Sequence, residues 1–276
     1  MADSIIVDPK FLNIDFSKQP EFTQGDLTQG RFGSELFGNI PNFAEAVPEL
    51  GDRDIEAYIE RISHEKMGLE WLVKYVLNQG REGSCVGNGV IAGTQVIQAK
   101  EFGLDDVTPL SAISLYQLIG RSANSGAMVD DGLETMQKVG AIPLDTPENR
   151  EKYGNIVMPP TGFRSSRPEG WEKVAKWFRI GEFYVVKTVN SLMTALIYGF
   201  PVIVGREGHC ICYLTPLLVN GKWAVLYVNS WGEWGMSAGL HDAGFGVDTI
   251  SQVKKSARYA FAIRSANSPI LLGRAA

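Results

Sequence analysis

Apolar residues recur at helical spacing soon after residue 50, and charged residues fill the opposite face. The apolar positions are Ile55, Tyr58, Ile59 and Ile62. This period is typical of an amphipathic helix with one solvent-facing side. Gly51 precedes the segment, and Asp52 is the residue type that often caps a helix N-terminus. The pattern therefore predicts a helix that begins at Asp52.

Residues 86–100 have apolar side chains on more than one face, which is typical of a helix buried inside a domain. Gly87, Gly89 and Gly93 lie within this segment, and each costs about 1 kcal/mol relative to alanine in a helix. We interpret them as points of close backbone packing. A glycine-bearing loop, residues 78–85, leads into the helix and ends at Cys85.

The following segments also have helical character, interrupted by glycine and proline. Further helix is predicted over residues 108–140, with a break at 122–126 and a stop at Gly140. Residues 145–170 contain four prolines and are predicted to be mostly loop, and residues 190–198 to form a short helix.

From residue 202 the pattern changes to that of β-strands. Strands are predicted at 202–204, 210–219 and 223–228, and Asn220-Gly221 is a strong hairpin signal between the last two. Helices early in the chain and antiparallel strands late in it predict an α+β fold.

The first 50 residues lack a clear period and are punctuated by glycine, proline, asparagine and glutamine, so we expect an extended arm. We divide the chain into this arm with the amphipathic helix (1–65), a main domain (66–264) and a C-terminal tail (265–276). An arm of this kind could also contact other proteins.

The composition is that of a soluble globular protein: 45% of the 276 residues are hydrophobic and 21% are charged. A net charge of −5 argues against a nucleic-acid-binding surface over the whole protein. No apolar run approaches the roughly 20 residues that a membrane span needs. The start has no signal-peptide pattern, so we expect a cytoplasmic protein. Nothing in the sequence calls for a metal or another cofactor.

Three cysteines are present, and Cys85 is the candidate for chemistry. A helix N-terminus stabilises a thiolate, the reactive form of cysteine. Taken alone, Cys85 is more simply a small core residue. Cys210 and Cys212 are two residues apart in a predicted strand, without easy bridging geometry, so no disulfide framework is expected.

A nucleophilic thiol needs a base within reach, itself oriented by a third group. Of three histidines, His64 lies on the exposed amphipathic helix and His241 in a glycine-flanked loop. His209 follows Gly208 and opens a strand, although a histidine there, taken alone, is more often a hydrogen-bonded strand-edge residue than a catalytic one.

Asn229 ends the strand that the hairpin pairs with the strand of His209, so the two residues come close together. An asparagine oxygen can accept a hydrogen bond from one imidazole nitrogen while the other faces a thiol. However, a regular hairpin with a two-residue turn would place them on opposite faces. A bulge must therefore shift the register by an odd number of residues, and Pro216 is a plausible position for it.

These motifs resemble those of the papain family of cysteine peptidases. Gln79-Gly80 before Gly83-Ser84-Cys85 resembles the nucleophile loop, Gly208-His209 the histidine strand, and Asn229-Ser230-Trp231-Gly232 the asparagine motif. The separations lie near the family's roughly 130–150 residues. The resemblance covers residues 66–264 and implies a papain-like fold, with a helical half against an antiparallel sheet.

The resemblance also implies roles for further residues. Gln79 would donate to the oxyanion together with the N–H of Cys85, and Trp231 would shield the His209–Asn229 hydrogen bond. Ser125-Gly126 aligns loosely with the glycine pair that binds the substrate main chain, although Ser125 equally suits a turn. Each residue also has an ordinary structural interpretation, as a loop or core residue.

The sequence departs from the family at several positions. Glu82 replaces a disulfide cysteine, and Val86 replaces the aromatic residue after the nucleophile. The connection from Val204 to His209 is short, which indicates a reduced primed side of the cleft. The arm also lacks the charged helical signature of the common inhibitory propeptide, so inhibition of that type is not predicted.

Two functions remain open. The first is a thiol peptidase that acts on peptide or protein substrates. The second is an assembly component that keeps the scaffold, such as a virion protein of a tailed bacteriophage, contacting other virion proteins through the arm. Intact Cys85, His209 and Asn229 favour an enzyme. A cleft blocked by the arm or by neighbours would favour the structural role or a latent enzyme.

Overall fold

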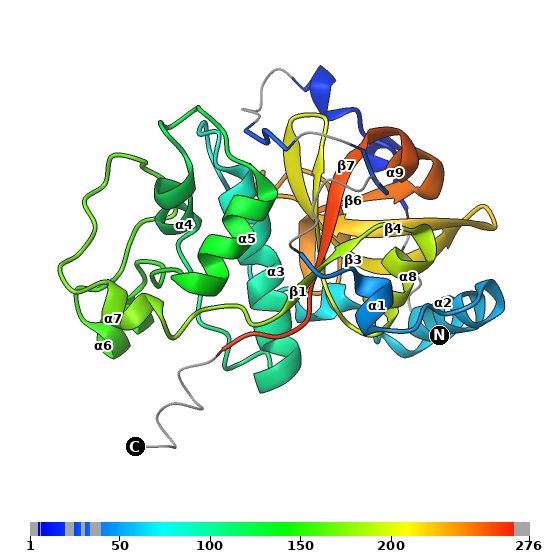
Figure 1. Ribbon diagram of the computed structural model, residues 1–276, viewed down its shortest axis with the longest axis horizontal. Helices are drawn as coiled ribbons and strands as arrows, with labels where there is room; N and C mark the ends of the chain where they lie inside the picture. The colour runs from blue at the N-terminus through cyan, green and yellow to red at the C-terminus, as the bar shows by residue number, and fades with distance from the viewer. Residues whose placement is uncertain (1–4, 6, 20–24, 29–30, 34–39, 268–276) are drawn as a thin grey trace.

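A computed structural model describes residues 5, 7–19, 25–28, 31–33 and 40–267 of the chain. Within these ranges, helices and a sheet form two halves that meet along one long helix (Figure 1). Most of the tail predicted at 265–276 and parts of the arm lie outside the described residues. In the described part of the chain, no helix is long and apolar enough to span a bilayer.

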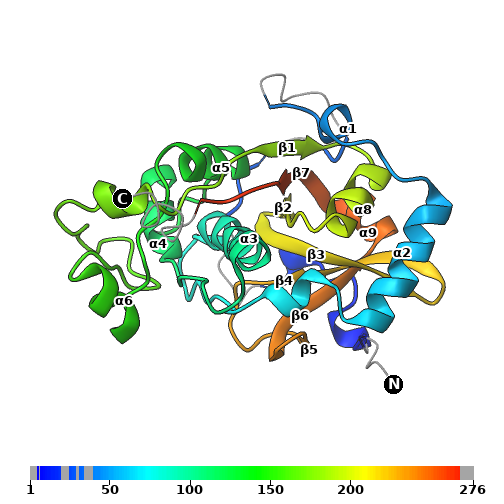
Figure 2. The same ribbon diagram turned by 90° about the horizontal axis from the view of Figure 1, so that it is seen from below.

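The helical half is built around α3, with α4 and α5 beside it and α6 and α7 at its outer end, while α1, α2, α8 and α9 lie by the sheet (Figures 1 and 2). The α-helices are α1 (Phe43–Ala46), α2 (Asp52–Glu65), α3 (Cys85–Phe102), α4 (Ala112–Ile119), α5 (Val129–Lys138), α6 (Pro147–Tyr153), α7 (Glu172–Ala175), α8 (Val189–Ile197) and α9 (Ile250–Ser256). Three 3₁₀ turns accompany them: η1 (Pro9–Phe11), η2 (Phe16–Lys18) and η3 (Leu69–Leu72).

The sheet has seven strands in the order β1-β7-β2-β3-β4-β6-β5, and all of its neighbouring strands are antiparallel. The strands are β1 (Phe183–Val186), β2 (Val202–Arg206), β3 (His209–Val219), β4 (Lys222–Val228), β5 (Met236–Ala238), β6 (His241–Thr249) and β7 (Ala257–Ile263). The predicted α+β class is therefore confirmed.

Most predicted elements are present, with two local corrections. The amphipathic helix has Gly51 as its N-cap, so Asp52 is its first residue and not its cap. The stretch predicted as mostly loop contains α6, since the side chain of Thr146 accepts from the N–H of Asn149 at 3.2 Å. Pro147 then starts the helix, at a position where no backbone N–H is needed.

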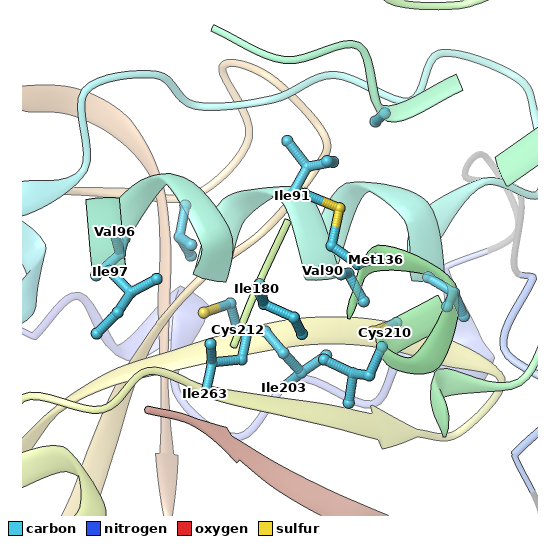
Figure 3. Close-up of a cluster of buried hydrophobic side chains, with 14 of the residues drawn as sticks. Val90, Ile91, Val96, Ile97, Met136, Ile180, Ile203, Cys210, Cys212 and Ile263 are labelled. Carbon is cyan, nitrogen blue, oxygen red and sulfur yellow. The ribbon is translucent and has the colours of Figure 1, made fainter. Parts of the chain in front are cut away.

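Strand β3 separates two hydrophobic clusters, because its side chains alternate between the two faces of the sheet. Cys210 and Cys212 face α3, whereas His209 and Ile211 lie on the face covered by α2, α8 and α9. Figure 3 shows the two cysteines beneath α3, among aliphatic side chains.

The glycines of α3 allow the helix to approach the sheet and its neighbour α4. A Cβ atom on Gly89 would lie 2.7 Å from the sulfur of Cys210, and one on Gly93 would lie 2.6 Å from Ile203. A Cβ atom on Gly87 would lie 2.8 Å from the carbonyl oxygen of Ala112. This close packing fixes the start of α3, and therefore Cys85, against the start of β3.

Candidate active site

Cys85 is the first residue of α3 and is completely buried. Burial, with a smaller contribution from the nearby charge of Asp26, raises the pKa of its thiol to about 12. Hydrogen bonds from the backbone N–H groups of Cys210, Gly25 and Val86 lower the pKa of the thiol and so oppose this shift. The thiol is thus protonated at neutral pH, despite its place at a helix N-terminus.

His209, the first residue of β3, forms a hydrogen bond with Asn229, which directly follows β4. The distance from Nε2 to Oδ1 is 2.7 Å. The same oxygen accepts the backbone N–H of Ser230 at 2.7 Å, which identifies it as the acceptor. Nε2 of a neutral His209 therefore carries the proton, and Nδ1 is left as the basic nitrogen.

Nδ1 of His209 is buried and has no hydrogen-bond partner among the described residues. Burial lowers the pKa of the imidazole to about 4; the bond to Asn229 opposes this shift and the charge of Arg206 adds to it. The backbone N–H of the next residue, Cys210, hydrogen-bonds to the Cys85 thiol, so the start of β3 lies beside the proposed nucleophile. Nδ1 and the thiol are nevertheless not hydrogen-bonded.

The register of the β3–β4 hairpin brings His209 and Asn229 to one face. Cys212 pairs with Val228 and Tyr213 with Tyr227, but the next paired residue is Thr215, opposite Leu226. Leu214 is thus the extra residue of a bulge. The predicted odd shift in register is confirmed, although its position is Leu214 and not Pro216.

Trp231 packs against the imidazole of His209, and Gln79 lies in the nucleophile loop, bonded to the asparagine motif. The ring centroid of Trp231 is 4.6 Å from that of His209, and the side chain is 5% exposed. Gln79 is completely buried; its Nε2 donates to the carbonyl oxygen of Glu82 at 2.8 Å. Its Oε1 accepts from the hydroxyl of Ser230 at 2.7 Å.

Backbone hydrogen bonds join the nucleophile loop to the asparagine motif. The N–H of Gln79 donates to the oxygen of Ser230 at 2.8 Å, and the N–H of Gly232 donates to that of Leu77 at 3.1 Å. These bonds hold the loop before Cys85 and the segment after Asn229 as one unit.

A segment of the N-terminal arm, Gly25–Thr28, crosses this site; we call it the cleft segment. The N–H groups of Gly25 and Asp26 both donate to the oxygen of Gly208, at 2.9 and 2.8 Å. On the other side, the N–H of Leu27 donates to Ala127 and the N–H of Ala127 donates to Gly25, each at 2.8 Å. The cleft segment is therefore bonded to both walls, next to Cys85 and His209.

Gly25 fits because two neighbouring loops carry glycine at the points of contact, Gly83 and Gly126. A Cβ atom on Gly25 would lie 2.0 Å from the oxygen of Gly83, and one on Gly126 would lie 2.5 Å from the oxygen of Gly25. Only bare backbone can approach this closely. Gly126 therefore lines the cleft, and the residue after it, Ala127, makes the main-chain bonds.

Asp26 is the buried side chain of the cleft segment. Its Oδ1 accepts the N–H of Thr28 at 2.9 Å, whereas its Oδ2 has no hydrogen-bond partner among the described residues. A Cβ atom on Gly205 would lie 2.4 Å from Oδ2. Burial raises the pKa of Asp26 to about 7, against the opposing effects of Thr28 and the charge of Arg258.

Ser125 and the other two histidines lie outside this arrangement. The hydroxyl of Ser125 accepts hydrogen bonds from the N–H groups of Arg121 and Ser122, at 2.8 and 3.0 Å. These local bonds stabilise a turn. His241 bonds to the carbonyl oxygen of Val73 at 2.8 Å. His64 lies in α2, and its side chain is outside the described residues.

The side-chain pattern of the arm did not predict the cleft segment, because main-chain pairing of this kind leaves no mark in that pattern. Within the described ranges, no group of three or more histidine, cysteine, aspartate or glutamate side chains could hold a metal ion.

No protein-family model matches the sequence, and no curated protein matches it either. Solved structures do match the fold. Xylellain, a cysteine protease from Xylella fastidiosa, is 18% identical with a TM-score of 0.57, over 88% of this chain and 98% of that chain. Procathepsin L2 proteinase from the larval midgut of Tenebrio molitor is 14% identical with a TM-score of 0.60, over 94% and 80%.

The proform of Amb a 11, a cysteine protease and ragweed pollen allergen, is 16% identical with a TM-score of 0.55, over 87% of this chain and 70% of that chain. At these identities the likeness concerns the fold. The chain therefore has the papain-like fold of these cysteine proteases.

Proposed function

We propose that this chain is a cysteine peptidase that hydrolyses peptide bonds, with Cys85 as nucleophile, His209 as base and Asn229 orienting that base. The observation that carries the proposal is the 2.7 Å bond between His209 and Asn229. It leaves Nδ1 basic, at the start of the strand that adjoins a helix-start cysteine. The fold is one that the similar structures use for cysteine proteases.

The proposed reaction begins when Nδ1 of His209 takes the proton of the Cys85 thiol. The thiolate attacks the carbonyl carbon, the C–N bond breaks, and the imidazolium returns its proton to the leaving amine. Water, deprotonated by His209, then hydrolyses the thioester. The N–H of Cys85 and the amide of Gln79 would donate to the oxyanion; one such donor is typically worth about 3–4 kcal/mol of barrier.

In the conformation described here, the enzyme would be latent. The cleft segment covers Cys85, whose pKa of about 12 keeps the thiol neutral, and the pKa of His209 at about 4 keeps the imidazole neutral. Peptide substrates cannot reach a buried sulfur. Two of the similar structures are described as a procathepsin and a proform, which fits an arm that must move.

The alternative is a structural assembly component, for example in a bacteriophage virion. A blocked cleft is compatible with that role as well. The arm, however, is held by bonds within this chain, at Gly208 and Ala127, and does not require a neighbouring subunit. No similar structure reported above is a virion protein. A purely structural role also does not require the hydrogen-bonded pair of His209 and Asn229, so we favour the enzyme.

The decisive experiment is labelling of the purified full chain with a thiol-reactive peptide electrophile, followed by mass-spectrometric assignment of the labelled cysteine. Cys85 should react slowly in the wild type, in the fraction of molecules whose cleft segment is displaced, and Cys85→Ala and His209→Ala should each abolish most of the labelling. Cys210 is packed beneath α3, so its thiol should stay buried and unreactive when the cleft segment moves. If Cys210 or Cys212 reacts as readily as Cys85, independently of His209, the proposal is wrong.

A second variant tests latency. Gly25→Ala places a methyl group against the backbone oxygen of Gly83, at 2.0 Å, and should displace the cleft segment. Labelling of Cys85 should then increase at least tenfold. Gly51→Ala is the matched control, because the nearest atom to its Cβ is 3.8 Å away. Equal labelling of the two variants would show that the cleft segment does not limit access.

A further inference from the structure

The imidazole of His209 packs against two aromatic side chains from distant parts of the chain, and these also contact each other. Trp231 lies 4.6 Å from its centroid, and Phe16 of the arm lies 4.8 Å away at an interplanar angle of 60°. Phe16 and Trp231 also meet each other edge-on, with centroids 5.3 Å apart and an interplanar angle of 89°. Phe16 and His209 are both completely buried.

Phe16 is held in this place by the connection between β2 and β3. Its N–H donates to the carboxylate of Glu207 at 2.9 Å, and the guanidinium of Arg206 lies 4.6 Å from its ring centroid. Arg206 also donates to the carbonyl oxygen of Ile14 and pairs with the buried carboxylate of Asp248. The arm at residues 14–16 is thus anchored to the turn that immediately precedes His209.

The short turn explains why an aromatic side chain from the arm is needed. Strand β2 ends at Arg206 and β3 begins at His209, so only Glu207 and Gly208 connect them. This connection cannot supply a further side chain to pack against the imidazole. The hydrogen bond to Asn229 fixes one atom of the ring, and contacts with two aromatic rings restrict its remaining rotation.

We infer that Phe16 is a positioning residue for His209, supplied by the arm in place of a longer connection between β2 and β3. Its catalytic consequence rests on the proposed function. The arm then has two parts with opposite effects: Phe16 completes the site, and the cleft segment, Gly25–Thr28, blocks it. Activation must therefore displace the cleft segment and leave Phe16 against His209.

The test compares Phe16→Leu with Phe43→Leu in the full chain. Both phenylalanines are completely buried in the same hydrophobic cluster, but Phe43 contacts Tyr184 and Phe200 and not the imidazole. The first measurement is the ¹⁵N NMR spectrum of the His209 side chain as a function of pH. The second is the pH profile of Cys85 labelling, with Gly25→Ala added to both variants.

In Phe43→Leu, His209 should keep the Nε2-protonated tautomer and the imidazole pKa of the wild type. In Phe16→Leu, the tautomers should mix and the pKa should rise, since solvent reaches the ring. Labelling should fall roughly tenfold, with a shifted pH profile. If Phe16→Leu does not fold, Phe16→Met serves in its place, because the flexible methionine side chain adapts to the space that the ring leaves.

An unchanged tautomer, pKa and pH profile in Phe16→Leu would overturn the inference and leave the proposed function intact. The proposed function can also fail by itself. In that case Cys85 would not label even with Gly25→Ala, while the NMR spectra would still show whether Phe16 orients His209.

Discussion

Nε2 of His209 lies 2.7 Å from Oδ1 of Asn229, across a hairpin whose regular form would place these side chains on opposite faces of the sheet. The contact exists because Leu214 has no partner in β4. One bulged residue therefore decides whether the proposed base meets its orienting group. Bulges near active sites commonly re-aim a side chain in this way.

Deleting Leu214 should consequently abolish the contact. In a regular ladder the side chain of His209 would point to the face of the sheet that packs against α3, away from Asn229. Labelling of Cys85 should then be lost. Leu214→Ala is the control: it keeps the bulge and removes buried volume, at a cost of about 2–5 kcal/mol in the free energy of unfolding. It should retain the Nε2-protonated tautomer of His209, seen by NMR. Labelling that depends on His209 in the deletion variant would contradict this explanation.

Sequence patterns predicted the fold class and several of its elements, because hydrophobic period and turn residues act locally. The all-round apolar character of residues 86–100 and the Asn220-Gly221 turn each correspond to an observed element. The alternation of faces even required a bulge between His209 and Asn229. Its position could not be predicted, because Leu214 and Pro216 both tolerate the irregularity and the packing of β3 selects between them.

Contacts that involve backbone alone, or residues far apart in the chain, left no such signal. The cleft segment binds Gly208 and Ala127 through main-chain groups, which every residue has. Phe16 meets His209 across nearly 200 positions of sequence, and the arm that contains Phe16 has no hydrophobic period that would single it out. The neutral state of Cys85 also follows from burial under the arm, which outweighs the effect of the helix N-terminus.

Asn229→Ala should weaken the proposed base without unfolding the protein. The imidazole would lose the acceptor for Nε2, and both tautomers would become populated. Labelling of Cys85 should fall about 100-fold in the Gly25→Ala background. Asn229→Asp keeps the acceptor and adds a negative charge, so the pKa of His209 should rise above that of the wild type. An unchanged His209 pKa in Asn229→Asp would contradict the observed hydrogen bond.

The position of Asp26 predicts that latency depends on pH. The pKa of its carboxyl is about 7 when docked, against 3.8 in its ordinary state, because burial disfavours the charged form. Docking is therefore at full strength below about pH 4 and weakens as pH rises through 7, by an amount on the order of a few kcal/mol. The groups that face Asp26 are Arg258, which opposes the shift, and Asp130, which adds to it.

Labelling of Cys85 should accordingly rise between pH 5 and pH 8 in the wild type. In Asp26→Asn the side chain cannot ionise, so the cleft segment should stay docked over this range and labelling should remain low. Dividing the labelling rate of the wild type by that of Asp26→Asn cancels the effect that ionisation of the thiol itself has on both rates. A constant ratio from pH 5 to pH 8 would show that Asp26 does not titrate in the docked arm.

Glu82 should contribute to stability as an anchor between two loops. Its carboxylate accepts the N–H groups of Gly162 and Phe163, at 3.0 and 2.8 Å, and so ties the nucleophile loop to the loop that contains them. This non-covalent link occupies the position where the resemblance expects a disulfide cysteine.

Glu82→Gln keeps one acceptor oxygen and turns an NH₂ group toward the other N–H, so it should lower the free energy of unfolding by about 1–3 kcal/mol. Glu56→Gln, on the exposed face of α2, should change it by less than about 0.5 kcal/mol. Urea denaturation of both variants measures the difference, and equal stabilities would mean that the two bonds of Glu82 do not stabilise the fold.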